Sequence, residues 1–292
     1  MVMAVSDFRL WCEKFAIDHG SPGVLVLALV FMLGFMVLVF LLVLLLMSPA
    51  LVFFTAGRRA ASRGRLARAE WCFAWFLSLS RVFSVGRQSL LVGLALSELG
   101  RVQLLQQRWQ EGVGLVSRAL KVFEQHKRPQ EMASALTMLA SAHLSQGRDE
   151  PAERLGRRAL TLLKQHGAEG KSKAFPCFLV LGTVARRRGR FDDAEAYLTR
   201  AVELGERLLG PDDQTLSIPL ETLGSVLSLR GRPAEAEPMF RRALAVREKK
   251  LGPRHPLVAQ SLRSLAAFLE ETNRISESDQ LLGRAVAIES GR

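Results

Sequence analysis

The sequence predicts an all-α protein in which a single transmembrane helix precedes a right-handed α-solenoid of helix–turn–helix repeats. Two observations carry this prediction. A set of residues recurs about every 42 positions in the last two-thirds of the chain, and residues 23–47 form an uninterrupted apolar run. Recurrence at a fixed period of this length is typical of stacked helical repeats, in which each unit buries its apolar face only against its neighbours.

Small residues define the repeat. An alanine recurs at spacings of 40, 42, 42 and 42 residues: Ala119, Ala159, Ala201, Ala243 and Ala285. Nineteen residues before each alanine stands another small residue: Gly100, Ala140, Gly182, Gly224 and Ala266. Eleven residues before each stands an arginine: Arg108, Arg148, Arg190, Arg232 and Arg274. Because small side chains let two helix backbones approach closely, the small positions are predicted to lie where the helices of a pair cross.

Each unit is predicted to be two helices joined by a tight turn. Gly189 and Gly231 occupy this turn in two repeats, where glycine permits a left-handed backbone at the end of the first helix. Asn273 replaces it in the last repeat, and asparagine also tolerates that conformation. The spacing predicts five repeats within 94–292, at about 94–132, 133–174, 175–216, 217–258 and 259–292.

The pattern L-G-x-x-(apolar)-x-x-x-G-R-(aromatic)-x-x-A-x-x-x-(apolar)-x-x-A resembles the tetratricopeptide repeat (TPR), whose usual period is about 34 residues. The period here is longer, and two connectors are near copies, LGPDD at 209–213 and LGPRH at 251–255. This combination is similar to the kinesin-light-chain-like branch of the family. That branch commonly carries asparagines just before the Leu-(Gly/Ala) of the first helix, where they hold the backbone of a bound peptide. The corresponding pairs here hold no asparagine: Thr137-Met138, Leu179-Val180, Glu221-Thr222 and Arg263-Ser264.

The first helices of such a solenoid line an extended concave surface that is suited to binding. The repeat register predicts these lining residues: Glu98, Arg101, Ser141, Ser145, Thr183, Arg186, Arg187, Glu221, Ser225, Ser228, Arg263 and Glu270. Simple solvent exposure is the alternative role for all of them. The central section is positive because it contains the cluster Arg186–Arg188, which suits a protein or peptide partner with acidic residues. The cluster is alternatively an exposed helix end.

Residues 23–47 contain no charged side chain. At 1.5 Å per residue the run is about 37 Å long, enough to cross a hydrocarbon core of about 30 Å. A cleaved signal peptide would have a shorter apolar region after a short basic start. Here a 22-residue segment that contains Asp7, Glu13 and Asp18 precedes the run. We therefore expect a membrane anchor.

The flanking charges predict the orientation of the anchor. Arginines follow the run closely: Arg58, Arg59, Arg63, Arg65 and Arg68. Because cytoplasmic flanks carry the excess of Lys and Arg, we expect residues 1–22 outside and the repeat domain in the cytoplasm. The excess of arginine over lysine is typical of a high-GC bacterial genome, so the bacterial inner membrane is the expected location. The same five arginines are expected to bind anionic lipid.

Residues 48–93 are predicted to form a basic juxtamembrane region with a degenerate sixth repeat that caps the solenoid. Gly57, Gly64 and Ala69 follow the repeat register, but Phe76 stands where the recurring alanine should be. The aromatic run at 71–77 is expected either to pack against the next repeat or to contact lipid headgroups, where Trp is favoured. Arg81, Gly86 and Arg87 argue against a second span.

Motifs for catalysis, cofactors and metals are missing from the sequence. The three cysteines are far apart, no histidines have metal-ligand spacing, and no phosphate loop, nucleophile elbow or His-Glu-x-x-His occurs. No cofactor, no metal and no enzymatic activity are therefore expected. A net charge of +12 is one feature of proteins that bind nucleic acid. Nucleic acid is not expected as a partner here, because the repeats mix 31 basic with 24 acidic residues over 97–292 rather than forming a basic stripe.

These features predict a membrane-anchored scaffold that binds partner proteins through its solenoid and holds them at the membrane. One alternative is an assembly factor for envelope or organelle-membrane complexes, with the repeat domain on the non-cytoplasmic side. An alternative of another class is a docking regulator of an enzyme or of nucleic acid.

Overall fold

The computed structural model describes residues 52–82 and 89–290. The chain divides into two compact units, Met1–Ser84 and Val85–Arg292. All regular structure in the described residues is helical, which confirms the predicted all-α class. None of the helices in these residues is both long and apolar enough to cross a membrane. The predicted span at 23–47 and the segment before it lie outside the described residues.

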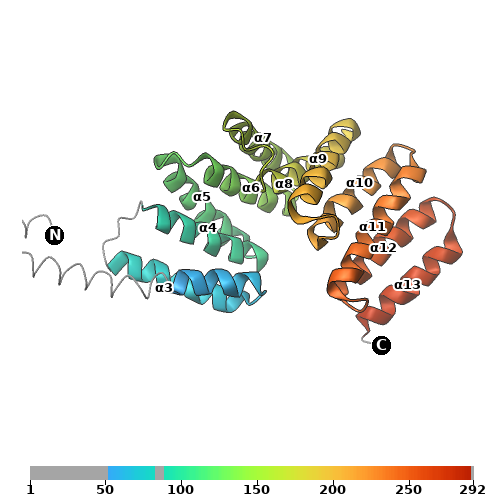
Figure 1. Ribbon diagram of the computed structural model, residues 1–292, viewed down its shortest axis with the longest axis horizontal. Coiled ribbons are helices and arrows are strands. Elements are labelled where there is room, and N and C mark those ends of the chain that lie inside the picture. Colours follow the sequence, from blue (N-terminus) through green and yellow to red (C-terminus); the bar gives the residue numbers. More distant parts are fainter. Residues whose placement is uncertain (1–51, 83–88, 291–292) are drawn as a thin grey trace, which may run out of the picture. The chain divides into compact units, whose positions relative to one another are not determined.

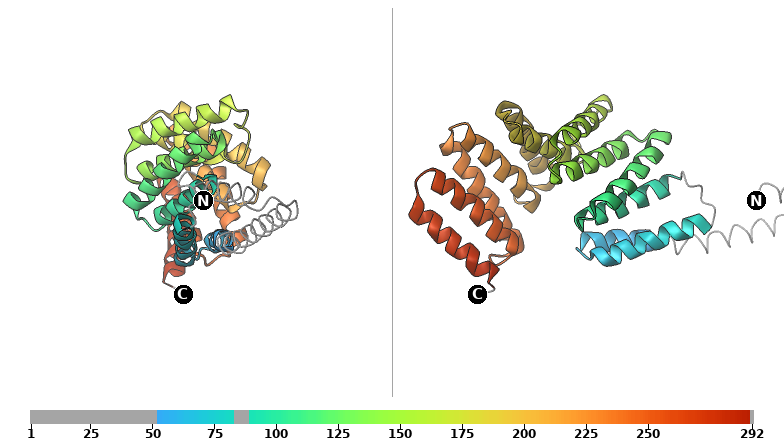
Figure 2. Two further views of the ribbon diagram at one scale, coloured as in Figure 1. Left: turned by 90° about the vertical axis from the view of Figure 1, so that its left-hand side faces the viewer. Right: turned by 180° about the vertical axis from the view of Figure 1, so that it is seen from behind.

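The second unit is a solenoid of five helix pairs (Figure 1). The pairs are α4 (Leu90–Leu105) with α5 (Trp109–Gln125), α6 (Pro129–Ser145) with α7 (Asp149–Gln165), α8 (Ala174–Arg187) with α9 (Phe191–Leu209), α10 (Ser217–Leu229) with α11 (Pro233–Leu251), and α12 (Pro256–Glu271) with α13 (Ile275–Glu289). Each helix packs on its partner and on the next helix along the chain, and the first helices of successive pairs also touch. The rear view in Figure 2 shows the same succession of pairs from green to red. This arrangement is the TPR-like solenoid that the repeat predicts.

A left-handed residue ends the first helix of each pair. The φ angle of this residue is +62° at Gln107, +75° at Gly147, +71° at both Gly189 and Gly231, and +61° at Asn273. The next residue, an arginine, donates its backbone N–H to the carbonyl five residues back, as from Arg190 to Ala185 at 2.9 Å. This hydrogen bond satisfies a carbonyl that the helix end would otherwise leave without a partner.

Two structural features lengthen the period from 40 to 42 residues. Between Ala159 and Ala201, the connector 166–173 from α7 to α8 is longer than the connector 126–128 from α5 to α6. The later spacings contain longer second helices. The second helices α5 and α7 have 17 residues, whereas α9 and α11 have 19. The longer helices end at Gly210 and Gly252, with φ of +93° and +85°. The side chains of Asp213 and His255 then accept the backbone N–H groups of Thr215 and Leu257, and so begin the next helical segments. The near-copied connectors LGPDD and LGPRH are thus helix-stop and helix-start signals.

Small-to-large pairs form the crossings of α8 with α9 and of α10 with α11. Gly182 faces Leu198, and Gly224 faces the ring of Phe240. A Cβ atom added at either glycine would lie within 3.0 Å of the facing side chain. The five recurring alanines of the second helices have no exposed surface. The repeated small residues therefore mark the positions where the two helix backbones of a pair approach most closely.

The described part of the first unit is a helical hairpin, with helical residues 52–62 followed by α3 (Leu66–Val82). Gly64, with φ of +70°, lies in the turn, and Gly57 packs against Phe73. Phe76, at the position of the missing alanine, is 3% exposed and its ring lies 5.5 Å from that of Phe54. An aromatic pair therefore fills the space between these two helices.

Candidate partner-binding groove

A groove of about 300 Å³ lies across the first helices α8, α10 and α12. Its floor is aromatic, because the rings of Phe240 and Phe268 lie 5.3 Å apart with 31° between their planes. Small and hydroxyl side chains surround these rings, and Leu229 is 54% exposed at the edge. The lining comprises Arg186, Glu221, Thr222, Ser225, Ser228, Leu229, Phe240, Ser264, Ala267, Phe268 and Glu271. Such a surface fits an apolar side chain flanked by hydrogen-bonding groups.

Four of the residues that the repeat register predicts as lining come together here: Arg186, Glu221, Ser225 and Ser228. Glu271, Thr222 and Ser264 also line the groove, although sequence reasoning did not select them. Each of them directly follows a selected residue in the sequence. A more accurate assignment of the helix face that points into the groove would have identified them.

Charge within the groove is uneven. Arg186 contributes the only cation among the lining residues, and its Nε is buried without a hydrogen-bond partner in the part of the chain that the structure describes. Glu271 accepts a hydrogen bond from Ser228 at 2.9 Å. A carboxylate beside Arg186 would give this guanidinium the charge-assisted partner that it lacks.

Glu221 is held by a network inside the protein. Arg247, whose side chain is 4% exposed, donates to Glu221 Oε1 at 2.8 Å, and Ser261 donates to the same oxygen at 2.5 Å. Arg247 also donates to Ser217 at 2.9 Å and to the Leu257 carbonyl at 3.1 Å. Burial raises the pKa of Glu221, and the hydrogen bond from Ser261 and the charge of Arg247 offset only part of that effect. The carboxylate therefore joins α10, α11 and α12.

The last repeat contains the same pair with its charges exchanged. Arg263 and Glu289, each 42 residues beyond Glu221 and Arg247, pair at 2.5 Å. Glu270 accepts a hydrogen bond from Ser278 at 3.0 Å. Both α12 side chains are thus directed at α13. The exchange of charge at a spacing of 42 is the sequence signal that would have revealed this pair.

The remaining predicted lining residues interact near their own helices. Arg101 and Glu98 form an ion pair at 2.9 Å within α4. Ser145 donates to the carbonyl of Ser141, and Thr183 donates to the carbonyl of Leu179.

The three arginines at the end of α8 have different surroundings. Arg187 donates to the Leu144 carbonyl at 2.9 Å and lies 3.3 Å from Asp149, both in the preceding repeat. Arg188 pairs with Glu153 at 2.8 Å. Only Arg186 lines the groove.

The recurring turn arginines connect neighbouring repeats. Arg190 pairs with Glu153 at 2.8 Å, and Arg232 and Arg274 pair with Glu195 and Glu237 at 2.9 and 2.8 Å. The three glutamates are spaced by 42 residues in the second helix of the preceding repeat, a recurrence that sequence reasoning missed. The side-chain hydrogen bond from Arg274 lowers the pKa of Glu237.

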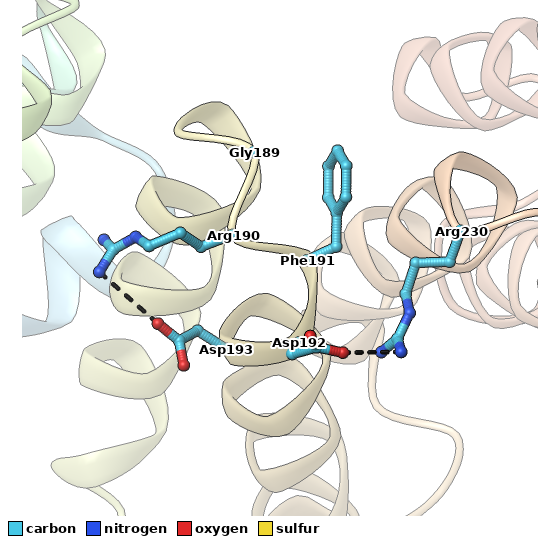
Figure 3. A pocket seen from close by; sticks show the side chains of 6 residues that line it. All are labelled: Gly189, Arg190, Phe191, Asp192, Asp193 and Arg230. Atoms are coloured by element: carbon cyan, nitrogen blue, oxygen red, sulfur yellow. Dashed lines mark ion pairs between the residues drawn. The ribbon is translucent and has the colours of Figure 1, made fainter.

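A larger hollow of about 370 Å³ lies at one of these junctions, bounded by Gly189, Arg190, Phe191, Asp192, Asp193 and Arg230. Figure 3 shows the two guanidinium groups directed at Asp193 and Asp192, at 3.5 and 2.7 Å, while the Phe191 ring points away. Every charged group of its lining therefore has a protein partner. The groove on the first helices, with the unpaired Arg186, is the better candidate for binding.

A solenoid of helix pairs with a groove on its first helices is a scaffold suited to protein–protein interaction. The family model described as Tetratricopeptide repeat matches residues 91–165, 177–249 and 216–288, which together cover more than half of the chain. The protein belongs to the tetratricopeptide repeat family. Members of this family are typically non-enzymatic scaffolds. No curated protein matches the sequence significantly.

Similar solved structures include kinesin-light-chain-like TPR proteins, as the sequence resemblance implies. BtubC (BKLC) from P. vanneervenii is 21% identical with a TM-score of 0.64, and the match covers 77% of this chain and 91% of that one. A putative kinesin light chain from Podosopora anserina is 18% identical with a TM-score of 0.54, and the match covers 68% and 94%. The Rap conjugation gene regulator of the plasmid pLS20, solved with a Phr peptide, is 15% identical with a TM-score of 0.57, and the match covers 82% and 73%. At these identities the likeness concerns the fold.

Proposed function

We propose that this protein is a membrane-anchored TPR scaffold that holds a partner protein in the groove formed by α8, α10 and α12. One observation carries the proposal: an aromatic floor and Arg186, whose Nε has no hydrogen-bond partner within 52–82 and 89–290, share a single groove. The partner presents an apolar side chain to Phe240 and Phe268 and an acidic residue to Arg186. A fold neighbour solved with a peptide supports a protein or peptide as the class of partner.

The apolar run at 23–47 supports membrane attachment, since it is long enough to span a bilayer. The arginines that follow it support a cytoplasmic repeat domain. In this arrangement the scaffold confines its partner to the membrane surface.

Photo-crosslinking in the native membrane tests the groove. The full chain would carry a photoreactive residue at Ser225, and the captured protein would be identified. Arg186→Glu should abolish capture, because it places a negative charge beside the acidic group of the partner. Arg118→Glu, on an exposed position of α5, is the matched control and should leave capture intact. Capture that survives Arg186→Glu would place the interface elsewhere.

Thiol labelling of intact cells tests the orientation. Cys12 should react with a membrane-impermeant reagent if residues 1–22 face outward. Cys177 cannot report the opposite side: it is fully buried, it donates to the Gly156 carbonyl at 3.2 Å, and burial raises its pKa to about 12. The exposed position Thr199, changed to Cys, reports the repeat domain instead. Labelling at Thr199→Cys but not at Cys12 would support the assembly-factor alternative.

A further inference from the structure

An exposed aromatic cluster lies on the hairpin of the first unit. It consists of Phe53, Trp71 and Trp75. The Phe53 ring lies 5.5 Å from that of Trp71 and 6.1 Å from that of Trp75, and the two tryptophan rings are 5.9 Å apart. Trp71 is 53% exposed and Trp75 is 46% exposed.

The hairpin does not need this cluster for its own core. Phe54, Phe73 and Phe76 form a separate set of ring contacts, in which Phe73 has no exposed surface. The aromatic side chains are thus divided between an inner set and an outer set. Neighbouring large exposed aromatic rings are uncommon on a protein surface that faces only water, and they mark interaction sites.

Exposed basic residues occur on the same hairpin, and one of them, Arg68, lies on the same face as the two tryptophans. Arg68, Trp71 and Trp75 follow one another at spacings of three and four, so they lie on one face of α3. Among the hairpin residues whose side chains the structure describes, the other arginines are also exposed: Arg58, Arg59, Arg63 and Arg65. Glu70 is the only acidic residue in the sequence of 52–82. A surface that accepts aromatic rings and carries negative charge therefore matches the exposed residues of this hairpin.

We propose that the Phe53–Trp71–Trp75 cluster docks at the boundary between headgroups and acyl chains of an anionic bilayer, with the exposed arginines of the hairpin on lipid phosphates. Trp is favoured at this depth because its ring is apolar while its N–H remains hydrogen-bonded in the polar region. Anionic headgroups attract adjacent basic side chains. This inference rests on the membrane attachment proposed above and adds a second contact, which holds the hairpin against the lipid surface.

Tryptophan fluorescence of the full chain tests the docking. Trp11 and Trp109 are replaced by Phe, so that emission comes from Trp71 and Trp75. The protein is reconstituted in phosphatidylcholine vesicles with and without phosphatidylglycerol, and with bromine atoms at shallow or deep acyl positions. We expect a blue-shifted emission in the anionic vesicles, with stronger quenching by shallow than by deep bromines. Replacing the five arginines by Gln should remove the dependence on phosphatidylglycerol.

A chain that retains only Trp109 is the matched control and should not be quenched by brominated lipid. Quenching of Trp71 and Trp75 by aqueous iodide but not by lipid would overturn the inference in favour of a solvated face. Quenching by neither would show that protein covers the cluster. A larger emission change with added oligonucleotide than with anionic lipid would identify nucleic acid as the partner. Carbonate extraction tests the anchor separately: release from the membrane would refute the span, whatever the fluorescence shows.

Discussion

At the scale of single residues, two kinds of charge hold this solenoid together. The turn arginines and their glutamates are partly exposed, so each pair contributes little by itself. The pair of Glu221 with Arg247 is largely buried, with side chains 14% and 4% exposed, so its two charges depend on each other. Removing one partner therefore has different consequences in the two cases.

Arg247→Met should destabilise the protein by about 3–5 kcal/mol, because it leaves the Glu221 carboxylate buried without its cation. The equivalent exposed pair offers a control: Arg263→Met, which removes the partner of Glu289, should cause only a small change. Denaturant unfolding of the detergent-solubilised chain, followed by circular dichroism, measures both. Adding Glu221→Gln to Arg247→Met should recover part of the loss; equal effects of the two arginine substitutions would contradict the structural role of this pair.

The pH dependence of stability should contain an acid limb from the glutamates between repeats. The pKa of Glu237 is lowered by the hydrogen bond from Arg274, so its contribution is present above the unfolded pKa and is lost as the pH falls through the folded pKa. Glu237→Gln should flatten the decrease in melting temperature below about pH 4.5. Glu203→Gln, which removes a local exposed pair within α9, is the control. If the melting temperature of Glu237→Gln still falls as steeply at low pH as that of the wild type, Glu237 does not contribute to the acid limb.

At the scale of elements, the helix crossings depend on complementary sizes. Gly182 faces Leu198 and Gly224 faces Phe240. Both glycines lower the intrinsic helix propensity of the first helices. The close approach that they allow therefore outweighs this local cost.

Gly224→Ala tests this balance. Its new methyl group would lie 2.9 Å from Cε2 of Phe240, so the substitution should cost about 1–3 kcal/mol despite its better helix propensity. Phe240→Leu in the same chain should restore part of the stability, since a smaller side chain makes room for the methyl group. At Gly283, where an added Cβ meets no atom within 4 Å, alanine should instead stabilise by about 0.5–1 kcal/mol. Thermal melts of the three variants and the wild type provide the comparison, and a stabilising Gly224→Ala would refute the crossing argument.

At the scale of the whole solenoid, stability should be local. Each repeat contacts only its neighbours, and one buried cluster spans α8 to α13 while another spans α6 to α9. A destabilising substitution in one repeat therefore weakens the interfaces with adjacent repeats and leaves the interfaces between distant repeats intact.

Hydrogen exchange should show this localisation. Arg247→Met is expected to speed exchange of the amides in α10 to α13, while α4 to α7 keep the protection that they have in the wild type. Mass spectrometry of the full chain resolves these segments. Uniform loss of protection over the solenoid would mean that the repeats unfold as one cooperative unit.

The sequence by itself determined the repeat, its helix–turn–helix content and its family, because these follow from the local spacing of small, apolar and turn residues. Gly189, Gly231 and Asn273 act within one turn, so their role could be deduced from the neighbouring positions alone. The sequence also identified Arg186 as a candidate contact, but it could not separate Arg186 from Arg187. That difference depends on which helix of another repeat lies within reach of each guanidinium. Tertiary structure decided that Arg187 and Arg188 bind the preceding repeat, that Arg247 holds Glu221, and that Arg186 Nε has no hydrogen-bond partner among the residues that the structure describes. The physical reason is that pairing energies depend on distances between residues 26 to 43 positions apart, and only the packing of the helices sets those distances.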